Sequence, residues 1–320
     1  MALRLARLSS SSFHERMARA KAQCGLSPLD RCFKRHPLQL ALGEVRKIKD
    51  LFADTELVCW PTVSMYYEGL RTRDLLIGKS TFYKYVRLLG LKRIWRRAIP
   101  KAVGLRATLP NEYWHVDTTF WELILGAKVA IALVSDNFSK AILGYSVSLS
   151  KHAPNVVAAL RGAIATMCEH HPDHPSTIVV ADGGGENHLP SGRQAAISVA
   201  ELIHRTPRPQ IIKVVALQDV VFSNSAIEGI NKILKQYLRY YNPRRSKPWS
   251  GWSAERQMIQ DYGFKRPHGS LNGLIPMERY KDPTLRLDRR EQIQQARAVR
   301  IEQNRQVNCG LCVVAAIKQG

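Results

Sequence analysis

Between residues 111 and 240 the period of the hydrophobic pattern changes repeatedly, and each change predicts a new element. The segments 113–120 and 129–135 are strand-like, and a third strand-like run covers 141–149 after a short polar turn. Such close spacing favours an antiparallel meander. The pattern then predicts a helix over 154–167, a strand over 177–181, a helix over 194–204, a strand over 211–216 and a helix over 225–240. This order predicts an α/β fold in which helices flank a mixed five-stranded sheet.

A helical pattern dominates residues 41–98, which we expect to form a compact all-α unit. Within it, apolar positions over 80–90 recur at helical spacing, Ser80 is suited to an N-cap, and Gly90 is suited to the C-terminal stop. The pattern is typical of a helix-turn-helix recognition helix, although any short amphipathic helix has it too. The outward-facing positions that we expect to contact DNA are Thr81, Lys84 and Arg87.

The distribution of charge indicates a polyanionic partner. The 320 residues carry a formal net charge of +22. Residues 1–110 hold 22 Lys or Arg against 8 Asp or Glu, residues 111–245 hold 13 against 11, and residues 246–320 hold 13 against 7. A nearly neutral centre between basic flanks favours nucleic acid over a generally basic surface.

These patterns divide the chain into six predicted segments. They are a basic N-terminal arm over 1–40, a helix-turn-helix-like DNA-binding domain over 41–98, a basic linker over 99–110, an α/β core over 111–245, a C-terminal helical extension of that core over 246–285, and a basic tail over 286–320. In the basic cluster that leads into the linker, we expect phosphate contacts from Arg93, Arg96 and Arg97.

Two other classes of protein are disfavoured. No run approaches the roughly 20 apolar residues that cross a bilayer, and the N-terminus lacks a signal-peptide core, so we expect a cytoplasmic, nucleoid-associated protein with no membrane contact. Of the six cysteines, only Cys309 and Cys312 have a metal-like spacing. No second ligand pair lies nearby in sequence, which favours reduced thiols over a zinc site.

Three carboxylates occupy positions where this fold places functional groups. Asp117 lies in the first predicted strand, Asp182 follows the fourth, and Glu228 lies near the start of the last helix. Open α/β sheets expose their functional edge at the carboxyl ends of strands, toward which Glu228 can point back. Three carboxylates can hold two divalent ions for phosphodiester chemistry. The structural alternatives are a turn at an Asp before Gly and a Glu that complements a helix dipole.

Five segments carry recognisable motifs, among them Asp-Gly-Gly-Gly-Glu-Asn at 182–187 and Asn-Ser-Ala-Ile-Glu at 224–228. The others lie at 114–145, 262–271 and 276–280. In this order they resemble the bacterial insertion-sequence transposases that share a retroviral-integrase-like catalytic core. The resemblance implies a ribonuclease-H-like core, an Asp-Asp-Glu site, and cleavage and strand transfer of DNA that depend on two Mg²⁺ or Mn²⁺ ions.

The resemblance also assigns residues. Asp117, Asp182 and Glu228 match the three acids of the family by local motif. Residues that it implies to lie near the DNA are Asn224, Lys232, Lys235, Arg266 and His268.

The third acid has a competitor. The 45 residues between Asp182 and Glu228 exceed the usual interval of the family, and Asp219, with 36 intervening residues, fits that interval better. Asp219 lies in a predicted loop, whereas Glu228 shares a helical face with Lys232 and Lys235. This context favours Glu228. Of two other polar groups near the first strands, we expect Asp136 to be structural, and His115 to be a hydrogen-bonded core histidine that faces the same side as Asp117.

The sequence therefore supports a hypothesis of a DNA transposase or integrase that acts on double-stranded DNA as a homo-oligomer, with or without an accessory transposition protein. One alternative is a catalytically silent integrase-like regulator or target-choice factor. Another is a nuclease with the same core, which would cut DNA without joining it.

Overall fold

The structure is a computed structural model that describes residues 9–21, 36–91, 105–122, 128–149, 153–181, 199–206, 209–215, 225–241 and 253–317. Its contacts divide the chain into two units. Unit 1 comprises Met1–Ala53, Gly69–Lys92 and Asp288–Gly320, and unit 2 comprises Asp54–Glu68 and Arg93–Leu287. This division by contacts differs from the predicted segments, because residues 54–68 belong with the α/β core and the C-terminal residues belong with the N-terminal helices.

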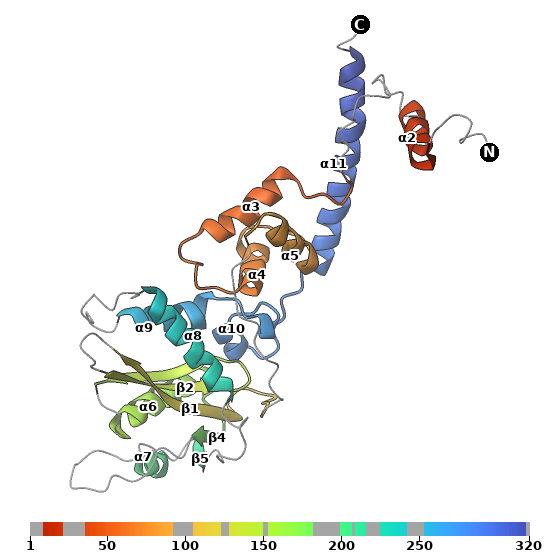
Figure 1. Ribbon diagram of the computed structural model, residues 1–320. Coiled ribbons are helices and arrows are strands. Elements are labelled where there is room, and N and C mark those ends of the chain that lie inside the picture. The colour runs from red at the N-terminus through yellow and green to blue at the C-terminus, as the bar shows by residue number, and fades with distance from the viewer. Residues whose placement is uncertain are drawn as a thin grey trace. The chain divides into compact units, whose positions relative to one another are not determined.

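Unit 2 contains the predicted mixed five-stranded sheet (Figure 1). The strands are β1 (Tyr113–Glu122), β2 (Lys128–Asp136), β3 (Ile142–Ser148), β4 (Ser176–Ala181) and β5 (Gln210–Val215). Their order across the sheet is β3-β2-β1-β4-β5. The first three strands form the expected antiparallel meander, and β4 and β5 join it in parallel. The predicted α/β class with a mixed five-stranded sheet is therefore confirmed.

Helices cover both faces of this sheet. On one face, α6 (Ala153–His170) and α7 (Val199–Arg205) pack on an apolar layer that includes Trp114 and Val116 of β1. On the other, the apolar side of α8 (Ser225–Tyr241) packs on Ile131 and Leu133 of β2. Because neighbouring residues of a strand point to opposite faces, the odd-numbered residues of β1 lie on the α8 side.

A close backbone approach fixes α6 against β3. A Cβ atom built on Gly144 of β3 would lie 2.1 Å from the carbonyl oxygen of Ala159 and 2.5 Å from the amide nitrogen of Ala163, both in α6. Gly162 of α6 faces the same point, and a Cβ atom there would lie 3.4 Å from the Cα atom of Gly144. The sequence holds glycine at both positions because the two backbones leave no room for a side chain.

The C-terminal part of unit 2 is helical. It contains α9 (Ser253–Gln260), a π-helical turn over Asp261–Lys265, a short 3₁₀ turn over Gly269–Leu271, and α10 (Pro276–Lys281). Residues 54–68, which include the first part of α4 (Thr62–Thr72), pack against it. Nε1 of the buried Trp60 donates to both carboxylate oxygens of Asp261 at 3.0 Å.

Unit 1 contains α2 (Ser10–Lys21), α3 (Leu42–Ala53), α5 (Lys79–Leu88) and α11 (Arg290–Ile317). The start of α5 corrects one expectation, because the N-cap is Gly78, without a side-chain hydrogen bond, rather than Ser80. The expected C-terminal stop is confirmed. Gly90 adopts φ +66°, and the amide of Leu91 donates to the carbonyl oxygen of Val86.

The helix α11 holds polar residues in the interior of unit 1. Nε of Arg300 donates to Oε2 of Glu44 in α3 at 2.8 Å, and a second bond joins its Nη2 to Oε1. The amide of the buried Asn304 donates to carbonyl oxygens of residues 36, 37 and 39 at 3.3, 3.0 and 2.8 Å. The part of α11 around Arg300 and Asn304 is therefore packed, although its polar sequence suggests a solvated helix or tail. Among the described residues, no helix is long and apolar enough to cross a membrane.

Candidate active site

Asp117 lies where β1 extends beyond its parallel neighbour. The ladder between β1 and β4 pairs Tyr113 with Ile178 and ends with Val116 opposite Ala181. On the other side of β1, Asp117 is still paired with Leu133 of β2. Its half-buried side chain is on the α8 face, at the carboxyl end of the β4 strand. The strand therefore presents a carboxylate at the edge where functional groups were expected.

Glu228 lies in the first turn of α8. The helix buries one apolar stripe, which comprises Ile227, Ile230, Leu234, Tyr237 and Leu238. Beside this stripe, Asn231 and Lys232 lie three and four residues after Glu228, and Lys235 lies four and three residues after them, so the four side chains share a helical face. An acid at this end is also favoured by the helix dipole.

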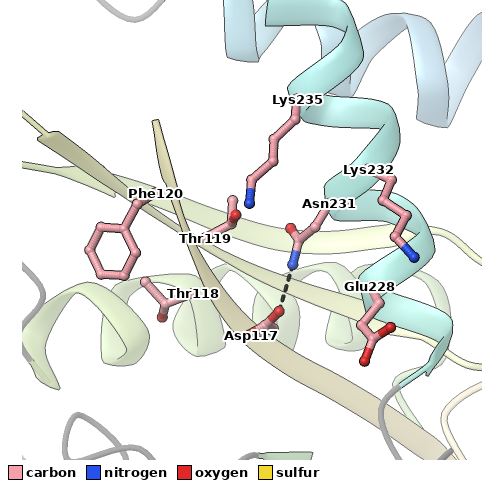
Figure 2. A pocket seen from close by; sticks show the side chains of 8 residues that line it. All are labelled: Asp117, Thr118, Thr119, Phe120, Glu228, Asn231, Lys232 and Lys235. Carbon is pink, nitrogen blue, oxygen red and sulfur yellow. Dashed lines mark hydrogen bonds between the residues drawn. The ribbon is translucent and has the colours of Figure 1, made fainter. Parts of the chain in front are cut away.

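The two carboxylates line one open pocket of about 380 Å³. Its wall consists of Asp117, Thr118, Thr119 and Phe120 of β1, and of Glu228, Asn231, Lys232 and Lys235 of α8. Figure 2 shows both carboxylates, with the lysines of α8 beside them. Tertiary structure thus brings together four residues that the sequence had singled out, from a strand and a helix far apart in the chain.

Asn231 is a pocket residue that sequence reasoning missed, as are Thr118, Thr119 and Phe120. Its Nδ2 donates to Oδ2 of Asp117 at 2.6 Å, which is the dashed line in Figure 2. The residue is 6% exposed, and its Oδ1 is buried without a hydrogen-bond partner among the described residues. Its position three residues after Glu228, on the helical face already predicted to be functional, was the available signal.

The donor set of this pocket suits a hard divalent cation. Mg²⁺ and Mn²⁺ prefer oxygen ligands, and the residues that line the pocket include two carboxylates and two threonine hydroxyls. Within the described ranges, no group of three or more His, Cys, Asp or Glu residues is arranged to hold a metal ion. The remaining predicted acid, Asp182, lies outside those ranges.

The other predicted DNA-contacting residues fall into three groups. On α5 of unit 1, Lys84 and Arg87 are exposed and Thr81 is half-buried, while Phe82 and Val86 are buried, and the contact of this helix with DNA stays a prediction. The second group lies outside the described ranges and comprises Arg93, Arg96, Arg97 and Asn224. Asp219, the competitor of Glu228, also lies outside these ranges.

Arg266 and His268 form the third group, and their surroundings favour a structural role over the predicted contact with phosphate. Arg266 is 4% exposed, and burial lowers the pKa of its guanidinium, against the attraction of Asp261. The ring of His268 packs edge-on against Tyr262, with centroids 4.9 Å apart. Burial lowers the pKa of His268 to about 4, and it raises that of Asp261 to about 6 although Trp60 donates to this carboxyl. His268 is therefore neutral at physiological pH.

The expected structural roles of Asp136 and His115 are confirmed. The buried carboxylate of Asp136 accepts bonds from the amides of Asn111 and Ser139 at 2.9 and 2.7 Å, and from the Ser139 hydroxyl at 2.6 Å. Burial raises its pKa, and these bonds oppose that shift. His115 is 1% exposed, and its Nε2 accepts a bond from Nδ2 of Asn137 at 2.7 Å.

Comparisons with known proteins return solved structures only, since no protein-family profile and no curated protein matches the chain. One similar structure is the simian T-cell lymphotropic virus intasome in complex with PP2A regulatory subunit B56 gamma, with 17% identity, a TM-score of 0.45, and coverage of 66% of this chain and 73% of that one. Another is the HTLV-2 integrase catalytic core domain in complex with magnesium, with 16% identity, a TM-score of 0.40, and coverage of 54% of this chain and 98% of that one. A third is the catalytic domain of Mos1 mariner transposase, with 11% identity, a TM-score of 0.30, and coverage of 71% of this chain and 92% of that one. At these values the likeness by itself assigns neither an activity nor a ligand to this chain.

Proposed function

We propose that this chain is a DNA transposase or integrase, which cleaves phosphodiesters at the ends of a mobile element and joins the resulting 3′-hydroxyls to target DNA. The observation that carries the proposal is the pocket in which Asp117 of β1 and Glu228 of α8 lie together, with Lys232 and Lys235 beside them. Two acids suit cations, and two lysines suit the phosphate backbone. The sequence resemblance adds the reaction class.

Asp117 and Glu228, together with Asp182, would hold two Mg²⁺ or Mn²⁺ ions. When bound, these ions would stabilise negative charge at the scissile phosphate and favour deprotonation of the attacking hydroxyl. Asp182 suits this set because it directly follows Ala181, the partner of Val116 in the parallel ladder.

The basic residues of α8 would hold the DNA. Lys232 is exposed and Lys235 is half-buried, and both line the pocket on the helical face of Glu228. Ammonium groups there can bind phosphates on either side of the reacting one and so orient it toward the carboxylates. Orientation of this kind supplies a large part of catalysis in phosphoryl transfer.

The exposed Lys84 and Arg87 of α5 would contribute sequence reading or additional phosphate contacts in unit 1. Because two element ends must be joined in one event, we expect a homo-oligomer assembled on double-stranded DNA. The hypothesis also includes an accessory transposition protein, whose effect can be measured by adding it to the assay.

The test uses labelled DNA fragments taken from the sequences that flank the gene, incubated with the full chain and Mg²⁺, with nicked and joined products scored separately. We expect both products with Mg²⁺ and neither in EDTA. Asp182→Asn should reduce both by at least about 10³-fold, the equivalent of roughly 4 kcal/mol in the barrier. Asp173→Asn, the same change at an exposed acid that does not line the pocket, is the matched control and should retain activity.

The remaining outcomes separate the alternatives. Cut but unjoined DNA would identify a nuclease, and specific DNA binding without either product would identify a regulator. Undiminished joining by Asp182→Asn would overturn the assignment of the acids.

A further inference from the structure

Asn231 differs from the other residues that line the pocket, because the NH₂ group of its buried amide forms a hydrogen bond and the amide oxygen forms none among the described residues. Its Nδ2 donates to Oδ2 of Asp117 at 2.6 Å, whereas its Oδ1 is buried without a partner in the part of the chain that the structure describes. We propose that Asn231 is a positioning residue, which holds the Asp117 carboxylate in the orientation that binds a divalent cation. The inference rests on the proposed function of this pocket.

The unsatisfied oxygen argues that the amide is not present for stability. A buried acceptor that loses its bond to water costs free energy, so an apolar residue of similar volume would suit this position in α8 at least as well. Leucine occupies position 234 on the same helix and is fully buried. An unsatisfied polar group of this kind needs an explanation, and a role in a functional site is one of the few available.

The polarity of the amide identifies the half that matters. An ionised carboxylate only accepts hydrogen bonds, so the side of Asn231 that faces Asp117 must be its NH₂ group. A donor to a metal-binding carboxylate restricts the rotation of that carboxylate and fixes which oxygen faces the ion. The bond also joins α8 to β1, so it sets the position of Asp117 relative to Glu228, three residues before Asn231 on the helix.

Asn155 of α6 offers a matched control. It is also 6% exposed, its Nδ2 donates to the carbonyl oxygen of Ala130 at 3.3 Å, and its Oδ1 is likewise buried without a partner among the described residues. It does not line the pocket. The two asparagines thus share burial and hydrogen-bonding state and differ in whether the accepting group is a pocket carboxylate.

The experiment measures Mn²⁺ binding to the full chain without DNA, by electron paramagnetic resonance of the free ion, for wild type, Asn231→Leu and Asn155→Leu. We expect Asn231→Leu to weaken Mn²⁺ binding by roughly 10- to 100-fold, the range typical for partners of metal ligands. Its unfolding midpoint should be unchanged or higher. Asn155→Leu should bind Mn²⁺ like wild type, which separates positioning from general packing.

A second measurement uses the DNA assay. The Mg²⁺ concentration for half-maximal joining should rise in Asn231→Leu by about the same 10- to 100-fold factor, while the affinity for DNA stays the same. Asn231→Ala, which introduces no new bulk, should show the same pair of changes and serves if the leucine variant does not fold.

Wild-type Mn²⁺ affinity in a folded Asn231→Leu or Asn231→Ala protein would overturn the inference, as would equal weakening by Asn155→Leu. Wild-type protein that binds Mn²⁺ but neither cuts nor joins DNA would overturn the proposed function and leave the positioning role intact. Wild-type protein that binds no Mn²⁺ at millimolar concentrations would overturn the inference.

Discussion

Val116 and Ala181 are the last paired residues of the parallel ladder between β1 and β4. Adjacent strands lie about 4.8 Å apart, so this pair sets the spacing at the edge where the two strands end their pairing. Asp117 follows the first residue of the pair, and Asp182 follows the second. The ladder therefore places Asp117 at the carboxyl end of β4, a strand far from β1 in the sequence.

The choice of Glu228 over Asp219 as the third acid can be tested by replacing each of these residues with the corresponding amide. Glu228→Gln should lower Mg²⁺-dependent joining by about 10³-fold, because it removes a charge that would hold the ions. Asp219→Asn should leave joining within a few-fold of wild type. Single-turnover assays on pre-cleaved ends give both rates, and the reverse pattern would transfer the role to Asp219.

Lys232 and Lys235 are expected to bind phosphates. Replacement of either by glutamine should weaken DNA binding at every sequence alike and should lower the slope of log K against log salt concentration by about 1. Lys281→Gln removes an exposed charge of α10 outside the pocket and is the control. Fluorescence anisotropy across a salt series measures the slopes, and identical slopes for all four proteins would contradict this role.

The close approach of β3 to α6 predicts a large effect from one methyl group. Gly144→Ala should destabilise the protein by about 2 kcal/mol or more, since its Cβ would overlap backbone atoms of α6 that cannot move alone. Gly229→Ala on α8, where a Cβ meets nothing within 4 Å, should instead stabilise by up to about 1 kcal/mol. Urea unfolding compares the two.

The half-buried His268 predicts a pH-dependent stability. Its folded pKa of about 4 is below the ordinary 6.5, so the unfolded chain binds a proton at pH 5 that the folded chain excludes. Stability from this group is fully present above pH 6.5 and is lost as the pH falls toward 4. Between pH 7 and pH 5 the loss is about 2 kcal/mol.

The His268→Gln variant should not show this loss of stability between pH 7 and pH 5. Asp261, whose pKa is raised, contributes the opposite trend in both proteins, so the difference between their unfolding free energies isolates His268. An equal pH dependence of the two proteins would show that His268 is solvated. Titration of the ring by NMR provides an independent value.

The hydrogen bonds from Arg300 of α11 to Glu44 of α3 predict that the C-terminal helix stabilises the N-terminal helices. Arg300→Met should lower the stability of unit 1 by roughly 1–3 kcal/mol, because Glu44 would lose two charged bonds in a mostly buried position. Arg305→Met changes an exposed arginine of the same helix and should have little effect. Hydrogen exchange of the α3 amides measures the difference, and equal protection in the two variants would contradict it.

Much of unit 2 could be predicted because its strands and helices are periodic and long enough to be distinguished locally. The alternation in β1, the meander and the amphipathic α8 all follow from side-chain direction within one element. The sequence could not reveal the pairing of Trp60 with Asp261 or of Arg300 with Glu44, since no local pattern encodes contacts between elements about 200 or more residues apart. The burial of Arg266 and His268 was missed for the same reason, because a polar stretch does not show what packs over it.

The sequence by itself determined the order of elements, the positions of Asp117 and Glu228 on a strand and on a helix, and the basic face of α8, since these depend on residue spacing. Only the tertiary structure decided that the two acids share a pocket, and that Asn231 reaches across from α8 to donate to Asp117. That decision depends on how α8 packs on the sheet. Buried apolar contacts between elements distant in the chain determine this packing, and the spacing of residues within each element does not.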